Sequence, residues 1–563
     1  MSALFTKHQD LLTKALDACS HRYAWSGWPE NPSSKIHGEE KPAAGLARFE
    51  AQLGQDFPLV QPGEVARVGE EVSPYTGEPL GVRYPRADPE VLFTAINSAR
   101  PAWAAATPEA RVGVCLEILQ RCGEQLFENA HATMHTSGQS YVMAFAGSGA
   151  NALDRGLEAL AYAHKAMQDV PATAHWERKF GRDGVASLDK RYRLVPRGIG
   201  VVICCATFPL WNTYPALCAS LATGNPVVLK PHPAATLPVA LVARVCREVL
   251  AEAGYDPNLV TLAADTRADP ATLPLIQHPD TAIIDFTGSP RFGSWLEQNC
   301  PGKQVYTETA GCNSVVLEST DDLQATARAV AHSLCQASAQ MCTSVQNIHV
   351  PAAGVRVAGE WVPHAEVAAA ICSAVDGWLA DPRAAATLCG TLFDPAVQSN
   401  VDRYRQLAAA QQRILRDSAP YENPGFPAAR TATPLVIAAS EDDRDWYREE
   451  VFGPVSFIIA NADAEACLRD ATGNARDRGA ITSHVYSTDA EFLARAVDAY
   501  HVAGASVACN LTGMPINFAA AYSDFHVTGL NPAGNACLAD LAFVSNRFRI
   551  VQSKFMGVAP ASA

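Results

Sequence analysis

Long hydrophobic runs are missing from this sequence of 563 residues, although 48% of its residues are hydrophobic. No apolar run reaches the length that is needed to span a bilayer. The first ten residues also lack the charged and then apolar order of a secretion signal. We therefore expect a cytoplasmic location and no membrane partner.

An excess of basic residues is missing as well. The chain has 44 Lys and Arg against 58 Asp and Glu, which gives a formal net charge of −14. Nucleic acids and anionic membranes are bound through basic patches. The composition therefore argues against nucleic acid as a partner.

Cysteine is plentiful, but the paired spacing of a zinc site is absent. The only close pair among the 16 cysteines is the adjacent Cys204-Cys205. Many cysteines without a pattern are typical of a reducing compartment, not of a disulfide framework. The sequence thus predicts no metal site.

The Gly-x-Gly-x-x-Gly fingerprint of dinucleotide-binding proteins is also missing. Between Gly198 and Glu308, however, short apolar runs alternate with helical segments. This pattern predicts an α/β fold with a doubly wound parallel sheet, which binds cofactors at the carboxyl ends of its strands. Gly288, Ser289 and Gly293 follow one such strand and open a helix, where backbone N–H groups can meet a phosphate. A turn without a ligand would look similar.

One thiol lies within a polar loop of small and amide-bearing residues, 336–347, just before an apolar strand. Loops on a rigid scaffold often carry chemistry, so Cys342 is a candidate nucleophile. Most free cysteines are simply small buried hydrophobes, and that interpretation stays open for Cys342 taken alone.

Four further stretches occur together with this loop. They are Gly224–Pro231, Phe286–Ser289 with Gly293, Thr307–Gly311 and Glu449–Pro454, and Glu308 precedes Cys342 by 34 residues. In this order and spacing they resemble the signature motifs of the aldehyde dehydrogenase superfamily, from about residue 63 to the end. The resemblance implies an NAD(P)-dependent oxidation in which Cys342 is the nucleophile and Glu308 the general base.

The resemblance also implies the cofactor contacts. Glu450 and Phe452 match the residues that hold the nicotinamide ribose and ring, and Lys230 lies where a lysine reaches a ribose or phosphate. The glutamate that often follows this lysine three positions later is replaced by Pro233. Without that carboxylate, the 2′-phosphate of NADP is not repelled, and His232 and Lys230 could meet it. The sequence therefore favours NADP, with NAD as the alternative.

One departure from the family concerns the oxyanion donor. The family has an asparagine amide there, whereas the register places Thr207 at this position, 23 residues before Lys230. Removing one oxyanion donor costs about 10²–10³ in rate. Either Thr207 substitutes for the amide, or Asn212 reaches in from the next turn, or the enzyme is slow on simple aldehydes.

Other stretches narrow the resemblance to the PaaN group, aldehyde dehydrogenases of aerobic phenylacetate degradation. They are Met134–Gln139, Cys205–Pro215, Gln340–Thr343 and Tyr522–Gly534, together with the N-terminal arm. The group implies oxidation of the semialdehyde of 3-oxo-5,6-dehydrosuberyl-CoA, a CoA thioester. The chain ends soon after Val551, so we expect ring opening to need a separate hydrolase. Asp524 and His526 could line the substrate mouth, although a packed loop is the simpler explanation for them.

The expected organisation follows from these assignments. We predict an aldehyde dehydrogenase-like fold with a cofactor domain, an α/β catalytic domain and a small β domain that, in the family, joins subunits into a homodimer or a dimer of dimers. The boundaries are 1–62 for the N-terminal arm, 63–173 and 196–307 for the cofactor domain, 308–540 for the catalytic domain, and 174–195 with 541–556 for the β element. The arm could pack on the surface, contact another subunit or form part of a substrate tunnel.

Several functions remain open on the sequence alone. The chain could be a general aliphatic or aromatic aldehyde dehydrogenase. A CoA-acylating enzyme is disfavoured, because Glu308 supplies a base for hydrolysis. A nicotinamide-independent thioesterase would leave the cofactor motifs idle, and an inactive scaffold would not need Cys342, Glu308 and Glu450 together.

Overall fold

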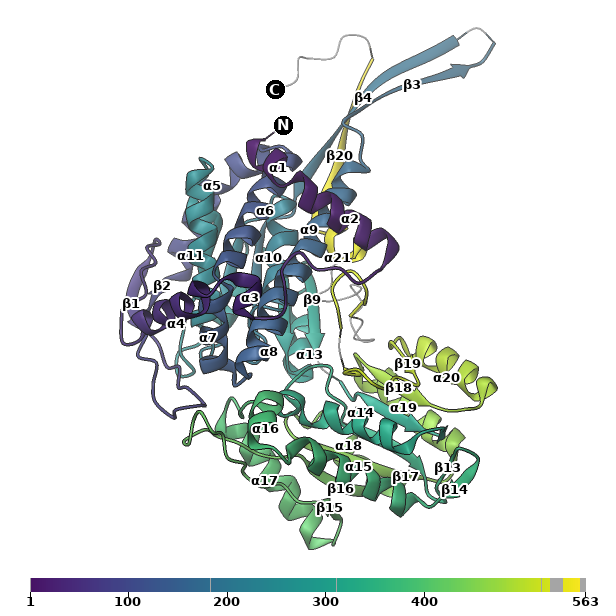
Figure 1. The fold of residues 1–563 in the computed structure, drawn as a ribbon. Coiled ribbons are helices and arrows are strands. Elements are labelled where there is room, and N and C mark those ends of the chain that lie inside the picture. Colours follow the sequence, from purple (N-terminus) through teal and green to yellow (C-terminus); the bar gives the residue numbers. More distant parts are fainter. Residues whose placement is uncertain (1, 183, 310, 518, 527–539, 557–563) are drawn as a thin grey trace.

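Two α/β units and one projecting β sheet make up the protein (Figure 1). The computed structural model describes residues 2–182, 184–309, 311–517, 519–526 and 540–556. Ala310 of the Glu308 motif and residues 527–534 of the stretch after Tyr522 lie outside the described residues. The predicted α/β fold with a doubly wound parallel sheet is confirmed.

The first unit is built on a five-stranded parallel sheet in the order β7-β6-β5-β8-β9. Its strands are β5 (Ile199–Ile203), β6 (Val227–Lys230), β7 (Val260–Leu262), β8 (Thr281–Gly288) and β9 (Gln304–Thr309). They are continuous apolar runs because helices cover both faces of the sheet. The chain moves outward from β5 to β7 and then returns to β8 on the other side of β5. This reversal opens a crevice at the carboxyl ends of β5 and β8.

Helices of the N-terminal third cover this sheet. The segment predicted as one helical block, 88–128, is divided into α5 (Pro89–Ala105), α6 (Pro108–Glu124) and the start of α7 (Leu126–Ser137). The break before α6 arises because the Thr107 hydroxyl caps the new helix by accepting from the Ala110 N–H (3.2 Å). Within the described residues no helix combines the length and the apolar character that crossing a membrane requires.

The second unit holds a seven-stranded sheet in the order β15-β16-β17-β12-β10-β18-β19, parallel except for β15. Its strands are β10 (Ser314–Leu317), β12 (Asn347–Pro351), β15 (Ile414–Arg416), β16 (Leu435–Ser440), β17 (Val455–Asn461), β18 (Ser483–Tyr486) and β19 (Ala508–Cys509). Val315 packs with α14 (Leu323–Cys335) and α15 (His364–Leu379) on one face. Val316 packs with α19 (Ala464–Arg478) and α20 (Ala490–Ala503) on the other. Both faces are therefore buried, as the alternation of side chains along a strand requires.

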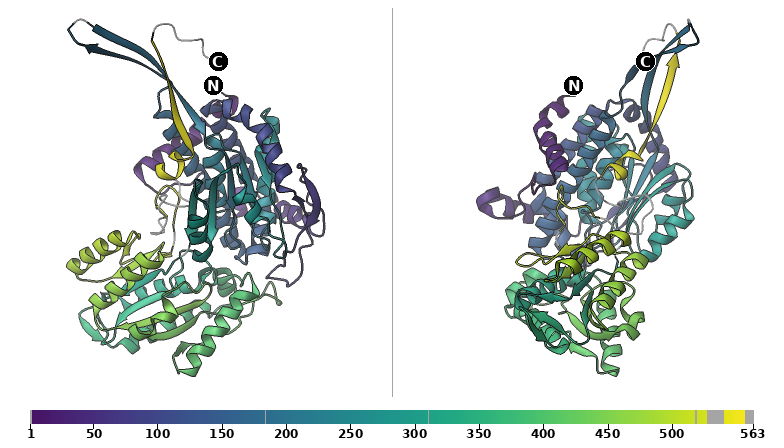
Figure 2. Two further views of the ribbon diagram at one scale, coloured as in Figure 1. Left: turned by 180° about the vertical axis from the view of Figure 1, so that it is seen from behind. Right: turned by 90° about the vertical axis from the view of Figure 1, so that its right-hand side faces the viewer.

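A three-stranded antiparallel sheet projects away from both units (Figures 1 and 2). It joins β3 (Thr173–Phe180) and β4 (Gly184–Pro196) to β20 (Phe548–Phe555), as the predicted pairing of the late segment requires. The late strand begins only at Phe548, however, so the first residues of the predicted 541–556 element are not strand. Phe543 lies in a short helix, α21 (Leu541–Ser545), because the Asp540 carboxylate caps it by accepting from the Phe543 N–H (2.7 Å).

A buried ion pair fixes the chain that leads into β20. The Arg547 guanidinium donates to both carboxylate oxygens of Asp285 on β8, at 2.9 and 2.6 Å. It also lies over the ring of Tyr306 on β9, 4.5 Å from its centre. Both charged side chains are almost fully buried, so this bidentate pair joins the projecting sheet to the first unit with a defined geometry.

Candidate active site

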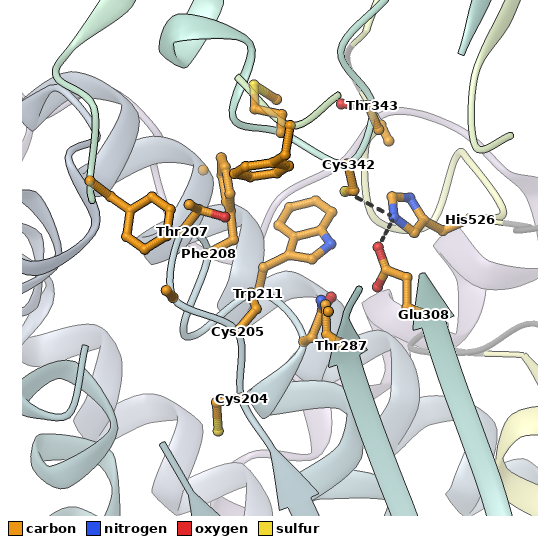
Figure 3. A pocket seen from close by; sticks show the side chains of 18 of the residues that line it. Cys204, Cys205, Thr207, Phe208, Trp211, Thr287, Glu308, Cys342, Thr343 and His526 are labelled. Atoms are coloured by element: carbon orange, nitrogen blue, oxygen red, sulfur yellow. Dashed lines mark hydrogen bonds and ion pairs between the residues drawn. The ribbon is translucent and has the colours of Figure 1, made fainter. Parts of the chain in front are cut away.

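A cavity of about 730 Å³ lies where the two units meet, at the carboxyl ends of β5 and β8. Its lining comes from segments far apart in the sequence, as the close view in Figure 3 shows. Cys342 from the second unit, Glu308 at the end of β9 and His526 from the C-terminal part meet there. A volume of this size suits a small-molecule or cofactor site.

The loop that carries Cys342 begins with a left-handed turn. Ala337, Ser338 and Ala339 have φ angles of 51°, 51° and 50°, a conformation that residues with a Cβ avoid at about 1–2 kcal/mol each. The buried Ser338 hydroxyl donates to the carbonyl of Cys389 (3.0 Å), which helps to hold the turn. Backbone strain of this kind is typical of functional sites, where the surrounding structure enforces it.

Asn313 fixes the backbone on both sides of the thiol. Its side-chain N–H₂ donates to the carbonyls of Cys342 and Ser344, both at 2.8 Å. Its side-chain oxygen accepts from the N–H groups of Ile481 and Thr482, at 2.9 and 3.0 Å. The buried amide therefore uses both of its ends to hold the nucleophile loop against the loop before β18.

Three reactive groups converge at the centre of the cavity. The His526 imidazole donates from Nε2 to Oε1 of Glu308 (2.7 Å), and the same nitrogen lies 3.6 Å from Sγ of Cys342. Glu308 and His526 are almost completely buried, whereas Cys342 reaches the cavity. The carboxylate predicted to be the base and the thiol predicted to be the nucleophile are thus brought together, and an imidazole joins them.

The electrostatics of the site keep the thiol protonated at rest. Burial, and after it the negative charge of Glu308, raise the pKa of the Cys342 thiol well above its usual range. The thiol is the weaker nucleophile, so attack on a carbonyl requires a base that removes its proton. Glu308 is the carboxylate within reach for that task.

The N-terminal arm holds the loop that presents His526. The Arg22 guanidinium lies over the Phe525 ring, 3.9 Å from its centre. The Trp25 ring packs against Tyr522, with 5.0 Å between the ring centres. Each of these contacts anchors a residue one to four positions before His526. The arm therefore lies on the surface and also packs against the segment that carries His526.

The arm contributes to the cavity wall as well. Glu30 lines the cavity beside Asn151, which belongs to the π-helical turn Ala146–Asn151 before α9 (Ala152–Gln168). Burial raises the pKa of Glu30, and its interaction with the Asn151 side chain opposes this. Of the three roles expected for the arm, packing on the surface and lining the substrate path both agree with the structure.

The glycine-rich turn after β8 lies at the other end of the cavity. Gly288 and Ser289 line it, and the Ser289 hydroxyl caps α13 (Pro290–Asn299) by accepting from the Phe292 N–H (3.4 Å). Gly293 is not among the lining residues. A Cβ at Gly293 would lie 2.4 Å from the Thr309 side chain, so this glycine lets α13 approach β9.

The two residues expected to meet a 2′-phosphate are placed differently. His232 lines the cavity, and burial lowers its pKa to about 4, so the imidazole is neutral at pH 7. Lys230 is buried beside the cavity and absent from the lining that is described. Its ammonium lies 2.8 Å from Asp265 and donates to the carbonyl of Pro231 (2.6 Å). The lysine charge is therefore already compensated by the protein.

Glu450 and Phe452 line the cavity on the side of the second unit, as predicted. The Gln346 side chain holds their segment by accepting from the Val451 N–H (2.6 Å). Burial raises the pKa of Glu450 to about 8. The N-terminus of α13 at one end of the cavity suits the phosphates of a nicotinamide dinucleotide. The aromatic rings and the carboxyl group near the thiol suit its nicotinamide ring and ribose.

Thr207 and Asn212 both line the cavity, so neither oxyanion candidate is eliminated. The carbonyl of Thr207 accepts from the Gln139 side chain (2.5 Å). In Figure 3 the Trp211 indole lies between Thr207 and Cys342. The role of Thr207 as oxyanion donor stays a prediction.

Comparison with known proteins decides the family. The family model described as "Aldehyde dehydrogenase family" matches residues 61–520. The chain belongs to the aldehyde dehydrogenase family. It is therefore an enzyme that oxidises aldehydes with NAD(P), and the thioesterase and scaffold alternatives are set aside.

Individual relatives agree with this assignment. An NAD-dependent aldehyde dehydrogenase from Burkholderia multivorans is 46% identical, with a TM-score of 0.95 over 100% of both chains. A 1-pyrroline-5-carboxylate dehydrogenase from Bacillus cereus (strain ATCC 10987 / NRS 248) is 26% identical over 504 residues, 86% of this chain and 91% of the relative. A Thermus 1-pyrroline-5-carboxylate dehydrogenase with bound NAD shares the fold at 19% identity, with a TM-score of 0.73 over 95% of this chain and 99% of that one.

Sequence reasoning missed three functional positions of this aldehyde dehydrogenase. His526 was considered only as a residue of the substrate mouth or of a packed loop, and nothing in the sequence indicated its contact with Glu308. Asn313 and Gln346 were not singled out, although each lies within four residues of a quoted motif or of Cys342. A buried amide next to a catalytic loop is a usable signal, because its donors and acceptors must all be satisfied.

Proposed function

We propose that this aldehyde dehydrogenase oxidises an aldehyde that is uncharged and largely apolar near its carbonyl group, to the carboxylic acid. The observation that carries this is the chemistry of the cavity wall. Among the described lining residues there is no Lys or Arg, and the wall includes Met143, Phe208, Trp211 and Pro515. An apolar wall with a few polar groups binds neutral substrates and disfavours buried anions.

This wall argues against a substrate like that of the pyrroline-5-carboxylate dehydrogenases. Such a substrate carries a carboxylate, which needs a cationic or multiply hydrogen-bonding partner when it is buried. The described part of the wall provides no cation, and its Glu30 side chain is itself acidic. We therefore propose a different substrate class for this chain, despite the 26% identity to that relative.

Within this class we propose the semialdehyde of 3-oxo-5,6-dehydrosuberyl-CoA, formed when a separate ring-opening hydrolase acts. Its chain next to the aldehyde is uncharged, which suits the wall, and the phosphates of CoA would remain outside the cavity. The second candidate is a general aromatic or apolar aldehyde, which the rings of Phe208 and Trp211 favour.

The chemistry begins at Cys342. Glu308 accepts the thiol proton, and the sulfur bonds to the aldehyde carbon to give a thiohemiacetal on Cys342. The carbonyl oxygen gains negative charge, for which the Cys342 backbone N–H and a side chain, Thr207 or Asn212, are the proposed donors. A bound nicotinamide supplies a hydride acceptor, and Gly288, Ser289, Glu450 and Phe452 would hold it. Loss of hydride leaves a thioester on Cys342.

Glu308 acts again in the second half of the reaction. It first releases the thiol proton to solvent and then removes a proton from a water molecule, and the hydroxide adds to the thioester carbon. The C–S bond then breaks, the carboxylic acid leaves, and the thiol of Cys342 regains a proton. The hydrogen bond from His526 holds the Glu308 carboxylate at the thiol while it performs both tasks.

A substrate comparison tests the proposed class. We expect kcat/KM for phenylacetaldehyde and for the CoA semialdehyde, generated in situ, to exceed that for succinate semialdehyde, an aldehyde whose only charged group is a carboxylate, by about 10²-fold, because burying an unpaired carboxylate costs several kcal/mol. The measurement is initial-rate formation of the reduced cofactor. Glu30→Gln should reduce this difference in kcat/KM, because it should raise kcat/KM for the anionic aldehyde. Equal kcat/KM for the neutral and anionic aldehydes would contradict the proposal.

For the cofactor we propose NAD, and this reverses the preference for NADP expected from the sequence. Lys230 is compensated by Asp265 and His232 is neutral, so neither presents a free cation to a 2′-phosphate. Arg267 lies near His232 but is itself paired with Asp394 and Glu70.

We expect kcat/KM with NAD to exceed that with NADP by about tenfold or more, which corresponds to about 1.4 kcal/mol. Steady-state rates with each cofactor at a saturating aldehyde concentration check this. Equal or better use of NADP would show that a cation elsewhere binds the 2′-phosphate.

The projecting sheet supports a proposed homodimer or dimer of dimers. Within the described residues β3 and β20 each pair on one side only, with β4. Edge strands with free N–H and C=O groups are suited to pairing with another chain. We propose that a second copy of this chain covers one of these edges.

A further inference from the structure

The central group of the cavity offers three different metal ligands at one point. Sγ of Cys342, Nε2 of His526 and a carboxylate oxygen of Glu308 all lie within 4.8 Å of one another. Two of the separations are 3.6 Å between sulfur and nitrogen and 2.7 Å between nitrogen and oxygen. Thiolate, imidazole and carboxylate are the ligands that zinc takes in proteins.

Two of the three separations are close to those around a tetrahedral zinc ion, and the third, between sulfur and the carboxylate oxygen, is at most 4.8 Å. Zn–S bonds of about 2.3 Å and Zn–N and Zn–O bonds of about 2.0–2.1 Å place S and N about 3.6 Å apart, and N and O about 3.3 Å apart. The observed sulfur–nitrogen distance already matches. The imidazole and the carboxylate need to separate by only about 0.6 Å, since their hydrogen bond would be replaced by two bonds to the metal.

The surroundings favour an ion that keeps one open position. Glu308 and His526 are buried, while Cys342 faces the cavity, which supplies a route for the ion and room for a fourth ligand such as water. Nδ1 of His526 is also buried and has no hydrogen-bond partner among the described residues. It can carry the imidazole proton once Nε2 binds the metal.

We propose that Zn²⁺ binds to Cys342, His526 and Glu308 and reversibly inhibits the enzyme. The ion replaces the thiol proton at Sγ, which is released to solvent, and the His526 proton moves from Nε2 to Nδ1. No electron is transferred. The metal occupies the nucleophile and the base together, so neither carbon–sulfur bond formation nor thioester hydrolysis can proceed until a chelator removes it. The inference does not depend on which aldehyde is the substrate.

Metal binding is tested on the full chain without substrate. Titration with Zn²⁺ should give one tight site per chain, and Co²⁺ in its place should give a thiolate-to-cobalt charge-transfer band with the visible bands of a tetrahedral site. Cys342→Ala should remove the charge-transfer band. His526→Ala should weaken Zn²⁺ binding by at least the 10–100-fold that loss of even an outer-sphere partner costs. Added Zn²⁺ should stop aldehyde oxidation by the wild type, and EDTA should restore it.

Two variants control for binding elsewhere on the chain. Cys509→Ala removes another partly exposed thiol, and His175→Ala removes an exposed imidazole next to two carboxylates. Both should keep the Co²⁺ spectrum, the Zn²⁺ affinity and the inhibition of the wild type. A cobalt band that persists in Cys342→Ala, an unchanged Zn²⁺ affinity in His526→Ala, or no tight site in the wild type would each overturn the proposal.

Discussion

Replacing Cys342 by alanine is expected to abolish aldehyde oxidation, lowering kcat by about 10⁴-fold or more, on the scale seen when other covalent enzymes lose their nucleophile. The reason is chemical, because an aldehyde cannot release hydride readily until an electron-rich adduct has formed at its carbon. The alanine variant retains the cavity but has no atom that can form the adduct. The measurement is formation of reduced cofactor with a saturating neutral aldehyde.

The variant should fold normally, since Cys342 lies at the cavity surface and its loop is held by Asn313 through backbone groups. Cys205→Ala is the matched control, because this thiol lines the same cavity. Burial raises the pKa of the Cys205 thiol to about 12. We expect Cys205→Ala to remain within about tenfold of the wild-type rate, a change of no more than about 1.4 kcal/mol. If Cys205→Ala did not oxidise the aldehyde and Cys342→Ala did, the assignment of Cys342 as the nucleophile would be wrong.

Replacing Glu308 by glutamine is expected to separate the two halves of the reaction. The steady-state rate should fall by about 10²–10⁴-fold, the usual contribution of a general base. The amide cannot take a proton from the thiol or from water, but loss of the Glu308 charge lowers the pKa of the Cys342 thiol, so the thioester can still form. Hydrolysis of the thioester should therefore become slower than its formation. Stopped-flow absorbance should then show at most about one reduced cofactor per subunit, followed by a near stop.

Glu366→Gln is the control for the loss of one negative charge. This glutamate is exposed in the first turn of α15, in the same unit as Cys342. It should leave the rate within about twofold of the wild type, as surface changes away from special features do. Multiple turnovers by Glu308→Gln at the wild-type rate would mean that another group activates the water.

Much of the fold was predictable from local patterns. The apolar runs that became β5, β6, β7 and β8 alternate with helical segments, and that alternation implies a parallel sheet with its site at the carboxyl ends. The start of the N-terminal arm, by contrast, forms two helices, α1 (Ala3–Lys7) and α2 (Gln9–His21), with a break at His8. His8 turns inward there, and its Nε2 lies 2.7 Å from Glu117, a long-range contact that periodicity does not contain.

Some residues of the site could likewise be predicted from the sequence, and others could not. Cys342 and Glu308 could be named because their spacing and flanking residues form a motif, and the structure brings them together. His526 could not be placed, because it reaches Cys342 across 184 residues of sequence. Its position depends on contacts between the N-terminal arm and the residues just before it, such as Arg22 with Phe525. The proposed preference for NAD also depends on the structure, since the pairing of Lys230 with Asp265 cannot be read from the sequence.

The central claim is that the reaction passes through a thioester on Cys342 that Glu308 helps to hydrolyse. It is tested most directly by mass spectrometry of Glu308→Gln, quenched with acid within the first turnover after mixing with a neutral aldehyde and NAD. The expected result is one added acyl group, the mass of the aldehyde less two hydrogens, on the peptide that contains Cys342, and none when NAD is omitted. An enzyme that forms reduced cofactor with no such adduct, or with the adduct on another residue, would contradict the claim.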